Sequence, residues 1–383
     1  MNLASLILTL AIISGQLIRV PLFSQGALTM LDIIVILTGS LGLLKLKFKL
    51  KRPPLFVISA FIFILFATIS LLLTPLFLTP MQKLNAFSYT LRFSSYIFLG
   101  WVIYSGAFPK VAEKIHLILV SSGAGLAALG LLQLLFLPNL NFMAQFGWDP
   151  HYFRTVSTFF DPNFAGAFFV LTIILILYFQ PFKNPKIFYL IFAVTFLALL
   201  TTFSRSSYLM FLTSGLSLSF LKKSKILALK IILLFLILIL GFQIYTQMVS
   251  KPRNIDRGQS ASFRINTWQQ GLQIFEKNPV LGVGFNAYRY ALIQYNLGDE
   301  QFLQSRGSSS NDSSLLYVAS TTGIIGLLSY LYFLLILVKG NETYRIIMFA
   351  LVLGLLVHSV FANSLFYPAI FIFLILLCAS PRK

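Results

Sequence analysis

Charged residues are scarce in this 383-residue chain, and their scarcity excludes an ordinary soluble domain. Only 10% of the residues are Asp, Glu, Lys or Arg, while 58% are hydrophobic, and the mean hydropathy is +0.87. Soluble domains carry roughly 25% charged residues. A chain with so little polar surface needs lipid as its main solvent, which predicts an integral membrane protein.

Cysteine is almost absent as well. Cys378 is the single cysteine, so neither a disulfide within the chain nor a cysteine-based zinc cluster can form. It lies in an apolar run, where we expect a small apolar side chain of a membrane helix. The chain also lacks a Walker P-loop, an HExxH motif and a CxxC pair. We therefore expect no ATP hydrolysis, no bound metal and no other cofactor.

Long apolar runs are what the chain does contain. Backbone groups in lipid need internal partners, so spanning segments are helices or closed barrels. Continuous runs of about 17–25 residues favour an all-α protein over the alternating strands of a barrel. The first run lacks a basic region and a cleavage site, so we interpret it as a span and not a removed signal peptide. The twelve predicted spans are residues 3–20, 27–44, 55–76, 87–107, 115–137, 164–179, 187–203, 206–221, 226–248, 314–338, 346–362 and 365–380.

The net charge of +19 follows the same pattern. Lys and Arg gather in alternate loops, around residues 45–52, 110–114, 183–186 and 222–225. The positive-inside rule places these loops and both termini in the cytoplasm. The opposite face then carries the loops near 75–86, 138–163 and 250–311. This distribution indicates topology and not nucleic-acid binding, so we expect the polar chemistry on the non-cytoplasmic face of the membrane.

The loop near 250–311 is too long to be a simple connection. Ile265, Trp268 and Leu272 recur at helical spacing, and Asn278-Pro279 ends that pattern,. A second helical stretch begins near Tyr288. We predict two short amphipathic helices that cover the mouth of the bundle. The expected division is residues 1–163 with the first five spans, 164–248 with spans six to nine, 249–311 as the large periplasmic loop, and 312–383 with the last three spans.

Two arginines are the strongest candidates for chemistry. Arg205 stands between two apolar runs, so it lies at the membrane boundary or inside the bundle. A charged side chain is costly in either place, and an arginine kept there indicates a functional site. Its planar fork suits phosphate oxygens, although snorkelling to lipid headgroups is the structural alternative. Arg264 lies in the first turn of the predicted loop helix, where a solvated or headgroup-bound side chain is the alternative.

Two further segments combine polar groups with helix starts. Asp161-Pro162-Asn163 follows His151 and Arg154, and Asp161 fits a helix N-cap before Pro162,. Asp312 opens the tenth predicted span, either as an N-cap or as a base toward a sugar hydroxyl. Gly323 and Gly326 fit close helix packing.

These segments occur in an order that resembles the O-antigen ligase and polymerase family of bacterial membrane glycosyltransferases. The resemblance covers roughly residues 153 to 338. Its most specific part is Asn278-Pro279-Val280-Leu281-Gly282-Val283-Gly284-Phe285, which follows Arg264 and Trp268. The other matching elements are Asp161-Pro162-Asn163, Ser204-Arg205-Ser206, Phe263-Arg264, Asp312 and Gly323-Ile324-Ile325-Gly326.

The resemblance implies about twelve helices, one large periplasmic loop and metal-independent transfer of a glycan from undecaprenyl diphosphate, with inversion. It implies that Arg205 and Arg264 bind the diphosphate and that Asp312 is the catalytic base. Membrane lipid and other polysaccharide assembly proteins are the further expected partners. Predicted additional substrate contacts are His151, Arg154, Asn163, Trp268 and Arg289.

Several functions stay open at this point. Ligases that use lipid A-core tend to have a histidine at the start of the helix after the large loop. Counting back from Gly323, that position is Asp312, and His358 lies in the next span. We therefore favour a polymerase over a ligase or a protein O-oligosaccharyltransferase. A membrane transporter is the alternative of another class, for which Asp32 and Arg92 are the strong intramembrane charges.

Overall fold

The computed structural model describes residues 2–22, 26–181, 184–250, 257–340 and 342–380. These residues are mainly helical, and each of the twelve predicted spans overlaps a helix of the described chain. Six lie in the first half: α1 (Leu3–Ser14), α2 (Met30–Lys45), α3 (Leu55–Leu72), α4 (Pro80–Tyr104), α6 (Ile115–Phe136) and α7 (Pro162–Phe179). The others are α8 (Pro185–Thr202), α9 (Arg205–Leu221), α10 (Lys225–Tyr245), α14 (Ser314–Lys339), α15 (Arg345–His358) and α16 (Pro368–Ala379).

Six of these helices are long and apolar enough to cross a membrane, namely α3, α6, α7, α8, α10 and α14, while α1, α15 and α16 are apolar but shorter. Much of their apolar surface has no protein cover. Only 11% of the most apolar stretch of α10 is buried, against 72% for α7. Because an apolar helix this exposed needs lipid around it, the protein is a multi-pass membrane protein. Twelve crossings stay a prediction.

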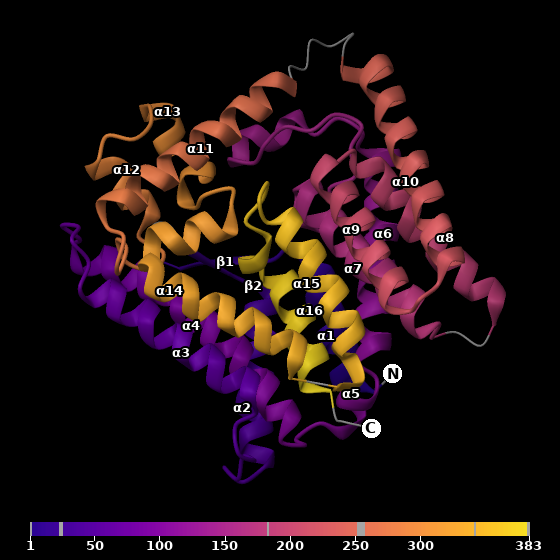
Figure 1. Ribbon diagram of the computed structural model, residues 1–383, viewed down its shortest axis with the longest axis horizontal. Helices are drawn as coiled ribbons and strands as arrows, with labels where there is room; N and C mark the ends of the chain where they lie inside the picture. The colour runs from indigo at the N-terminus through magenta and orange to yellow at the C-terminus, as the bar shows by residue number, and fades with distance from the viewer. Residues whose placement is uncertain (1, 23–25, 182–183, 251–256, 341, 381–383) are drawn as a thin grey trace.

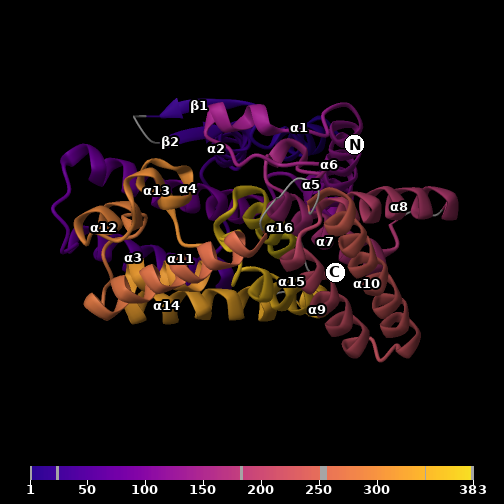
Figure 2. The same ribbon diagram turned by 90° about the horizontal axis from the view of Figure 1, so that it is seen from above.

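The helices divide into two sides around a centre. Figure 1 shows α3, α4 and α14 on one side, α8, α9 and α10 on the other, and α15 and α16 between them. Figure 2 shows the same division from above. The closest packing pairs are α9 with α15 and α14 with α3. The helices α11 (Arg257–Lys277), α12 (Tyr288–Gln294) and α13 (Glu300–Gln304) lie at one end.

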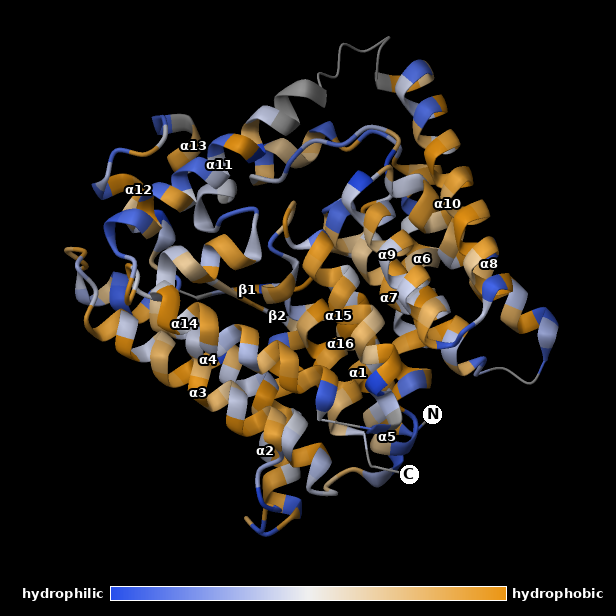
Figure 3. Cartoon of the chain, in the orientation of Figure 1, coloured by the Kyte–Doolittle hydropathy of each residue, from blue (hydrophilic) through white to orange (hydrophobic). Residues whose placement is uncertain are grey.

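The opposite end of the molecule carries α5 (Pro109–Glu113) and both marked ends of the chain. Figure 3 shows apolar residues over the helices of the bundle and more polar residues over α11–α13. The distribution of polarity therefore separates an apolar bundle from a polar layer at one end.

The first helix is shorter than the predicted span 3–20. It ends at Ser14 because Gly15 has a positive φ of 52°,. A side chain at Gly15 would collide with the backbone and hydroxyl of Thr158. The chain then forms a hairpin of β1 (Arg19–Leu22) and β2 (Gly26–Thr29), in which Arg19 pairs with Thr29. This boundary depends on a contact with a residue far away in the chain, which local hydropathy does not report.

The long loop also differs from the prediction of two short helices. Its first helix, α11, has 21 residues and ends at Lys277, before Asn278-Pro279 as expected. It packs on α14, which explains how a helix of low hydrophobicity reaches this length. The short helices α12 and α13 and a 3-10 turn, η5 (Arg306–Ser309), follow it. Residues 251–256 of the predicted loop lie outside the described residues.

The membrane helix α14 is interrupted at Gly323, which has φ 64° and ψ −169°. Residues 279–284, which we call the clasp, fill this interruption. The clasp and α14 share four backbone hydrogen bonds: Val283 N to Ser320 O (3.1 Å), Gly284 N to Thr321 O (2.9 Å), Ile324 N to Pro279 O (2.8 Å) and Ile325 N to Val280 O (3.5 Å). Backbone groups that the interrupted helix cannot satisfy itself are therefore paired within the protein, as lipid requires.

The two segments approach so closely that glycine is needed on both sides. Gly282 has a φ of 68°, and a Cβ there would strike the backbone of Thr321. A Cβ on Gly323 would strike the backbone of Val280. Ser70 of α3 donates to the carbonyls of Leu281 (2.5 Å) and Thr321 (2.7 Å) and closes the junction. The role of the clasp in this structure is therefore to join the long loop to the helix bundle.

Candidate active site

The N-termini of α7 and α9 meet in the bundle. Asp161 caps α7 as predicted, with Oδ1 accepting from Asn163 N (2.6 Å) and Phe164 N (3.2 Å),. Ser204 caps α9 by accepting from Ser207 N. The Ser204 hydroxyl also donates to the Asn163 side chain at 2.8 Å and joins the two caps. Arg205, the first residue of α9, is exposed at this junction.

The end of α8 is held at the same junction by Arg154. Its Nε donates to Thr202 O at 2.8 Å, and the guanidinium also reaches Phe203 O at 3.4 Å. Arg154 therefore binds the last carbonyls of α8 directly before Arg205. His151 lies in the preceding loop, where its carbonyl accepts from Leu140 N at 2.9 Å. A substrate contact by either residue stays a prediction.

Arg264 lies on α11 within electrostatic reach of Arg205 and Asp312. Its pKa is lowered because burial disfavours the charged guanidinium, while the Asp312 carboxylate acts in the opposite direction and Arg205 lowers it further,. The structure thus brings together three residues from separate elements. We call Arg205, Arg264 and Asp312 the polar cluster.

Asp312 is not the helix cap that the sequence allowed. Ser313 caps α14, since its side chain accepts from Leu316 N. The Asp312 carboxylate instead accepts from the Thr267 hydroxyl at 3.2 Å. Burial raises its pKa to about 6, against the lowering effects of Arg264 and Thr267,. A carboxyl group with this pKa is ionised at neutral pH and can accept a proton.

The backbone that carries Asp312 is fixed by Asn311, which sequence reasoning did not single out. Its side-chain nitrogen donates to Thr267 O and to the Tyr288 hydroxyl (2.9 Å), and its side-chain oxygen accepts from Ser313 N (2.8 Å). All three bonds are buried. Asn311 therefore connects α11 and α12 to the start of α14 and places Asp312 beside α11. In the sequence, only its position directly before Asp312 could have indicated that Asn311 belongs to the site.

His358 is closer to the site than its place in the next span suggests. Its Nε2 lies 3.3 Å from the hydroxyl of Ser207, which also bonds Ser204. Ser314 N donates to Ser359 O (2.8 Å), so the end of α15 adjoins the start of α14. His358 therefore lies close to the N-terminus of α9 in space, although the sequence places it in a later span. Packing of α15 against α9, which no local pattern encodes, produces this proximity.

Trp268 and Arg289 have anchoring contacts in this structure. The Trp268 indole donates to Val360 O at 3.0 Å and holds α11 against the segment after α15. Arg289 donates to Ser308 Oγ (2.8 Å) and Ser305 O (2.6 Å), which fixes α12 to the turn η5. Substrate contacts by these two side chains stay predictions.

Among the described residues, no carboxylate lies within 4.0 Å of Arg205 or Arg264. Among the described residues, the ion pairs within 4.0 Å are Arg92–Asp32 and Arg345–Glu342. The guanidinium of Arg205 lies 6.0 Å from the centre of the Phe242 ring. The described residues contain no group of three or more His, Cys, Asp or Glu side chains that could hold a metal ion. The arrangement offers two cations and one base to an anionic, hydroxyl-bearing substrate.

A comparison with family models agrees with the motifs. Residues 190–331 match the family model described as O-antigen ligase. The matched segment contains Arg205, Arg264, Asp312 and the clasp. No curated protein sequence matches the chain significantly. The family resemblance read from the motifs is confirmed, and over residues 190–331 the protein carries the domain of the O-antigen ligase family.

Proposed function

We propose that the protein is a glycosyltransferase of surface polysaccharide synthesis that uses a polyprenyl-diphosphate-linked glycan as donor. One observation carries this proposal. Arg205 and Arg264 have no carboxylate within 4.0 Å among the described residues, and Arg264 interacts electrostatically both with Arg205 and with Asp312, whose pKa is about 6. Arginines bind diphosphate oxygens through charge-assisted hydrogen bonds. The N-terminus of α9 adds a partial positive charge beside Arg205.

The step follows from these positions. An acceptor hydroxyl attacks the anomeric carbon of the donor, the new carbon–oxygen bond forms, and the bond to the diphosphate oxygen breaks. The hydroxyl proton passes to Asp312, and the electron pair leaves with the polyprenyl diphosphate. Arg205 and Arg264 stabilise the negative charge that grows on the leaving group. Attack from the face opposite the leaving group inverts the anomeric carbon, and no metal takes part.

Polymerase and ligase differ in their acceptor. We favour a polymerase, whose acceptor is another lipid-linked repeat unit, because Asp312 occupies the position where ligases tend to have a histidine. The ligase is the second candidate. It is supported by the description of the matching family model and by His358, which lies beside Ser207 and so brings an imidazole to the site. Transfer to a protein acceptor is the third outcome that the same donor chemistry permits.

The transporter alternative loses its main support. Asp32 and Arg92 form an ion pair at 2.9 Å, and Asp32 also accepts from Tyr96 and from the backbone of Thr29. Both charges are therefore explained by structure. The proposed setting is the cytoplasmic membrane of a bacterium, with the basic loops and termini in the cytoplasm and the polar cluster on the periplasmic face.

The test uses purified protein in detergent with an undecaprenyl-diphosphate oligosaccharide, without nucleotide or metal. Gel electrophoresis and mass spectrometry of the products detect a ladder of longer lipid-linked glycans, which a polymerase produces. Transfer only after lipid A-core is added identifies a ligase, and transfer only to an added protein identifies an oligosaccharyltransferase. Absence of transfer to every acceptor contradicts the proposed function.

A further inference from the structure

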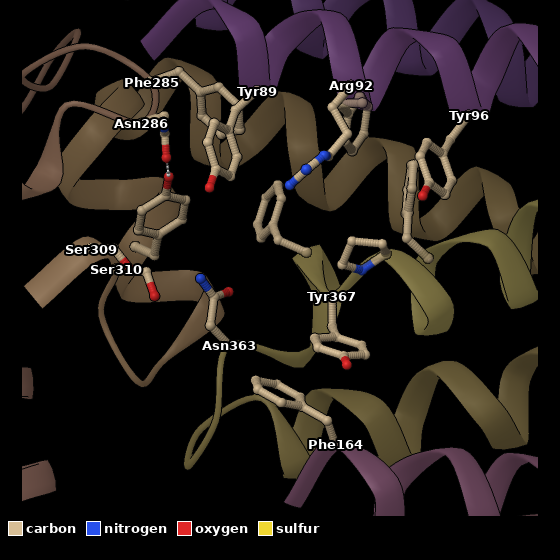
Figure 4. Close-up of a pocket in the computed structure, with 15 residues that line it drawn as sticks. Tyr89, Arg92, Tyr96, Phe164, Phe285, Asn286, Ser309, Ser310, Asn363 and Tyr367 are labelled. Carbon is tan, nitrogen blue, oxygen red and sulfur yellow. Dashed lines mark hydrogen bonds between the residues drawn. The ribbon is translucent and has the colours of Figure 1, made fainter. Parts of the chain in front are cut away.

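A cavity of about 200 Å³ lies between α4, α7, α14 and the start of α16. Its walls come from the middle of α4, the start of α7, the first turn of α14, and the segments 285–286, 309–310 and 363–368. Figure 4 shows Tyr89, Arg92 and Tyr96 on one wall, with Asn363, Tyr367 and Phe164 facing them. We call it the aromatic cavity, because nine of its fifteen lining residues are Phe or Tyr.

The polar groups in this cavity are few and convergent. The side-chain oxygen of Asn363 is buried and has no hydrogen-bond partner among the described residues. A buried polar atom of this kind is costly unless a ligand or water satisfies it. Asn286 and Ser310 add polar atoms at the same end of the cavity as Asn363. Asn363 therefore presents an amide to any molecule that enters.

The charge of the cavity argues against an anion. Arg92 is the one charged residue among its described lining residues, and the buried Asp32 carboxylate balances it. The amides and serines equally disfavour a hydrocarbon chain, which cannot satisfy them. Flat aromatic walls with a few amide and hydroxyl groups fit a neutral pyranose, whose faces are apolar and whose edge carries hydroxyl groups.

Three chain connections link this cavity to the polar cluster. Phe164 lines the cavity and directly follows Asn163, the partner of Ser204. Ser310 lines it two residues before Asp312. Asn363 lies on the same segment as Val360, the partner of Trp268 on α11. The cavity and the polar cluster are therefore built partly from the same short segments of the chain.

We propose that the aromatic cavity binds the terminal pyranose of the acceptor glycan, with Asn363 as the hydrogen-bonding residue and rings such as Phe164 and Tyr317 as its walls. This inference rests on the proposed transferase function. It assigns a second, neutral subsite to the acceptor, separate from the diphosphate subsite of Arg205 and Arg264.

The test measures sugar binding without catalysis. Methyl glycopyranosides of glucose, galactose, mannose and the N-acetylhexosamines are added at millimolar concentration to the purified full-length protein in detergent. Saturation-transfer NMR reports which of them bind. These probes have an acceptor-like hydroxyl edge and no diphosphate. The variants are Asn363→Leu, Arg205→Ala and the control Gln273→Leu, which makes the same type of change at an exposed position on α11.

We expect at least one glycoside to bind the wild type, Arg205→Ala and Gln273→Leu, and to bind Asn363→Leu about tenfold more weakly or not at all. The Asn363→Leu protein should keep or increase its melting temperature, because the replaced oxygen has no protein partner to lose. Weaker sugar binding with an unchanged or higher melting temperature would show that Asn363 acts in binding and not in folding.

Three results would overturn the inference. The first is that no glycoside binds the wild type, and the second is that Asn363→Leu binds as the wild type does. The third is binding lost in Arg205→Ala but kept in Asn363→Leu, which assigns the sugar to the donor at the polar cluster. Asparagine-dependent binding in a protein without transfer activity would support a sugar site here and contradict the proposed function.

Discussion

The polar cluster and the aromatic cavity both contain arginine, but the two regions use it in opposite ways. In the cavity, Arg92 contacts the buried Asp32, which is 1% exposed, and Arg92 itself is 19% exposed. In the cluster, Arg205 and Arg264 pair with no described carboxylate, and burial lowers the pKa of Arg264. The first arrangement is complete within the protein. The second has positive charge that an anionic ligand can balance.

This contrast separates structural charge from functional charge. A buried ion pair stabilises the fold mainly in the sense that removing one partner leaves the other uncompensated. A cation without a carboxylate partner contributes little to folding and much to binding. Substitutions in the cluster should therefore reduce activity and leave stability unchanged, whereas substitution of Arg92 should reduce stability first.

The largest expected effect is on transfer by Arg205→Ala and Arg264→Ala. Each should reduce the rate of glycan transfer by about 100- to 1,000-fold, because one stabilising group for the leaving diphosphate is lost. The melting temperature should stay close to that of the wild type. Ladder formation at matched protein levels checks this, and Lys277→Ala on the exposed end of α11 is the control. Full activity in both variants would contradict the proposal that Arg205 and Arg264 bind the diphosphate.

Asp312→Asn should reduce transfer by about 100-fold, since the amide keeps the shape of the side chain and cannot take the proton. The hydrogen bond from Thr267 can still form with the amide oxygen, so folding should be preserved. Single-turnover transfer with saturating donor measures the chemical step. Wild-type rates in Asp312→Asn would show that another group, such as His358, accepts the proton.

Arg92→Ala should destabilise the protein by about 3–5 kcal/mol, because Asp32 remains buried without its partner. Thermal unfolding in detergent measures this change. Arg345→Ala is the matched control, since that arginine is 54% exposed, its partner Glu342 is 82% exposed, and exposed pairs contribute about 0–1 kcal/mol. Equal melting temperatures for the two variants would contradict the structural role of the Arg92–Asp32 ion pair.

The smallest expected effect is on pH dependence. Because the pKa of Asp312 is about 6 and the ionised form is the base, transfer should fall as the pH drops below about 6. Thr267→Val removes a hydrogen bond that favours the ionised carboxylate, so the midpoint should move to higher pH, by roughly one unit or less. Rate–pH profiles check the shift. Thr195→Val, whose hydroxyl bonds within α8, should leave the midpoint in place.

Apart from the first span and from α4, which begins at Pro80 and not at residue 87, the helices were predictable to within about four residues, because each depends on local properties. Asp161 and Pro162 define the start of α7 by cap geometry alone,. Pro279 defines the end of α11 in the same way. The predicted end of the first span was wrong because the helix ends at Gly15, which packs against Thr158, a residue more than 140 positions away. The long α11 was underestimated because α14 supports it.

The residue types of the site were also predictable, because an arginine next to an apolar run is costly in any fold of the chain. The roles of these residues were not predictable. The sequence left Asp312 as either a cap or a base, and Ser313 takes the cap. It placed His358 away from the site, and the packing of α9 with α15 brings it to Ser207. It marked Asp32 and Arg92 as possible transport residues, and they form a pair.

The amino-acid sequence by itself determined that this is a helical membrane protein and which polar residues are available for chemistry. Those conclusions depend on the apolar length of each run and on the cost of charge in lipid, both of which are local. Only the tertiary structure decided which charges are balanced and which are open to a ligand. Balance depends on distances of a few ångströms between residues 60 or 151 positions apart, such as Arg92 with Asp32 and Ser207 with His358. Electrostatic energy falls with distance in space and not with separation along the chain.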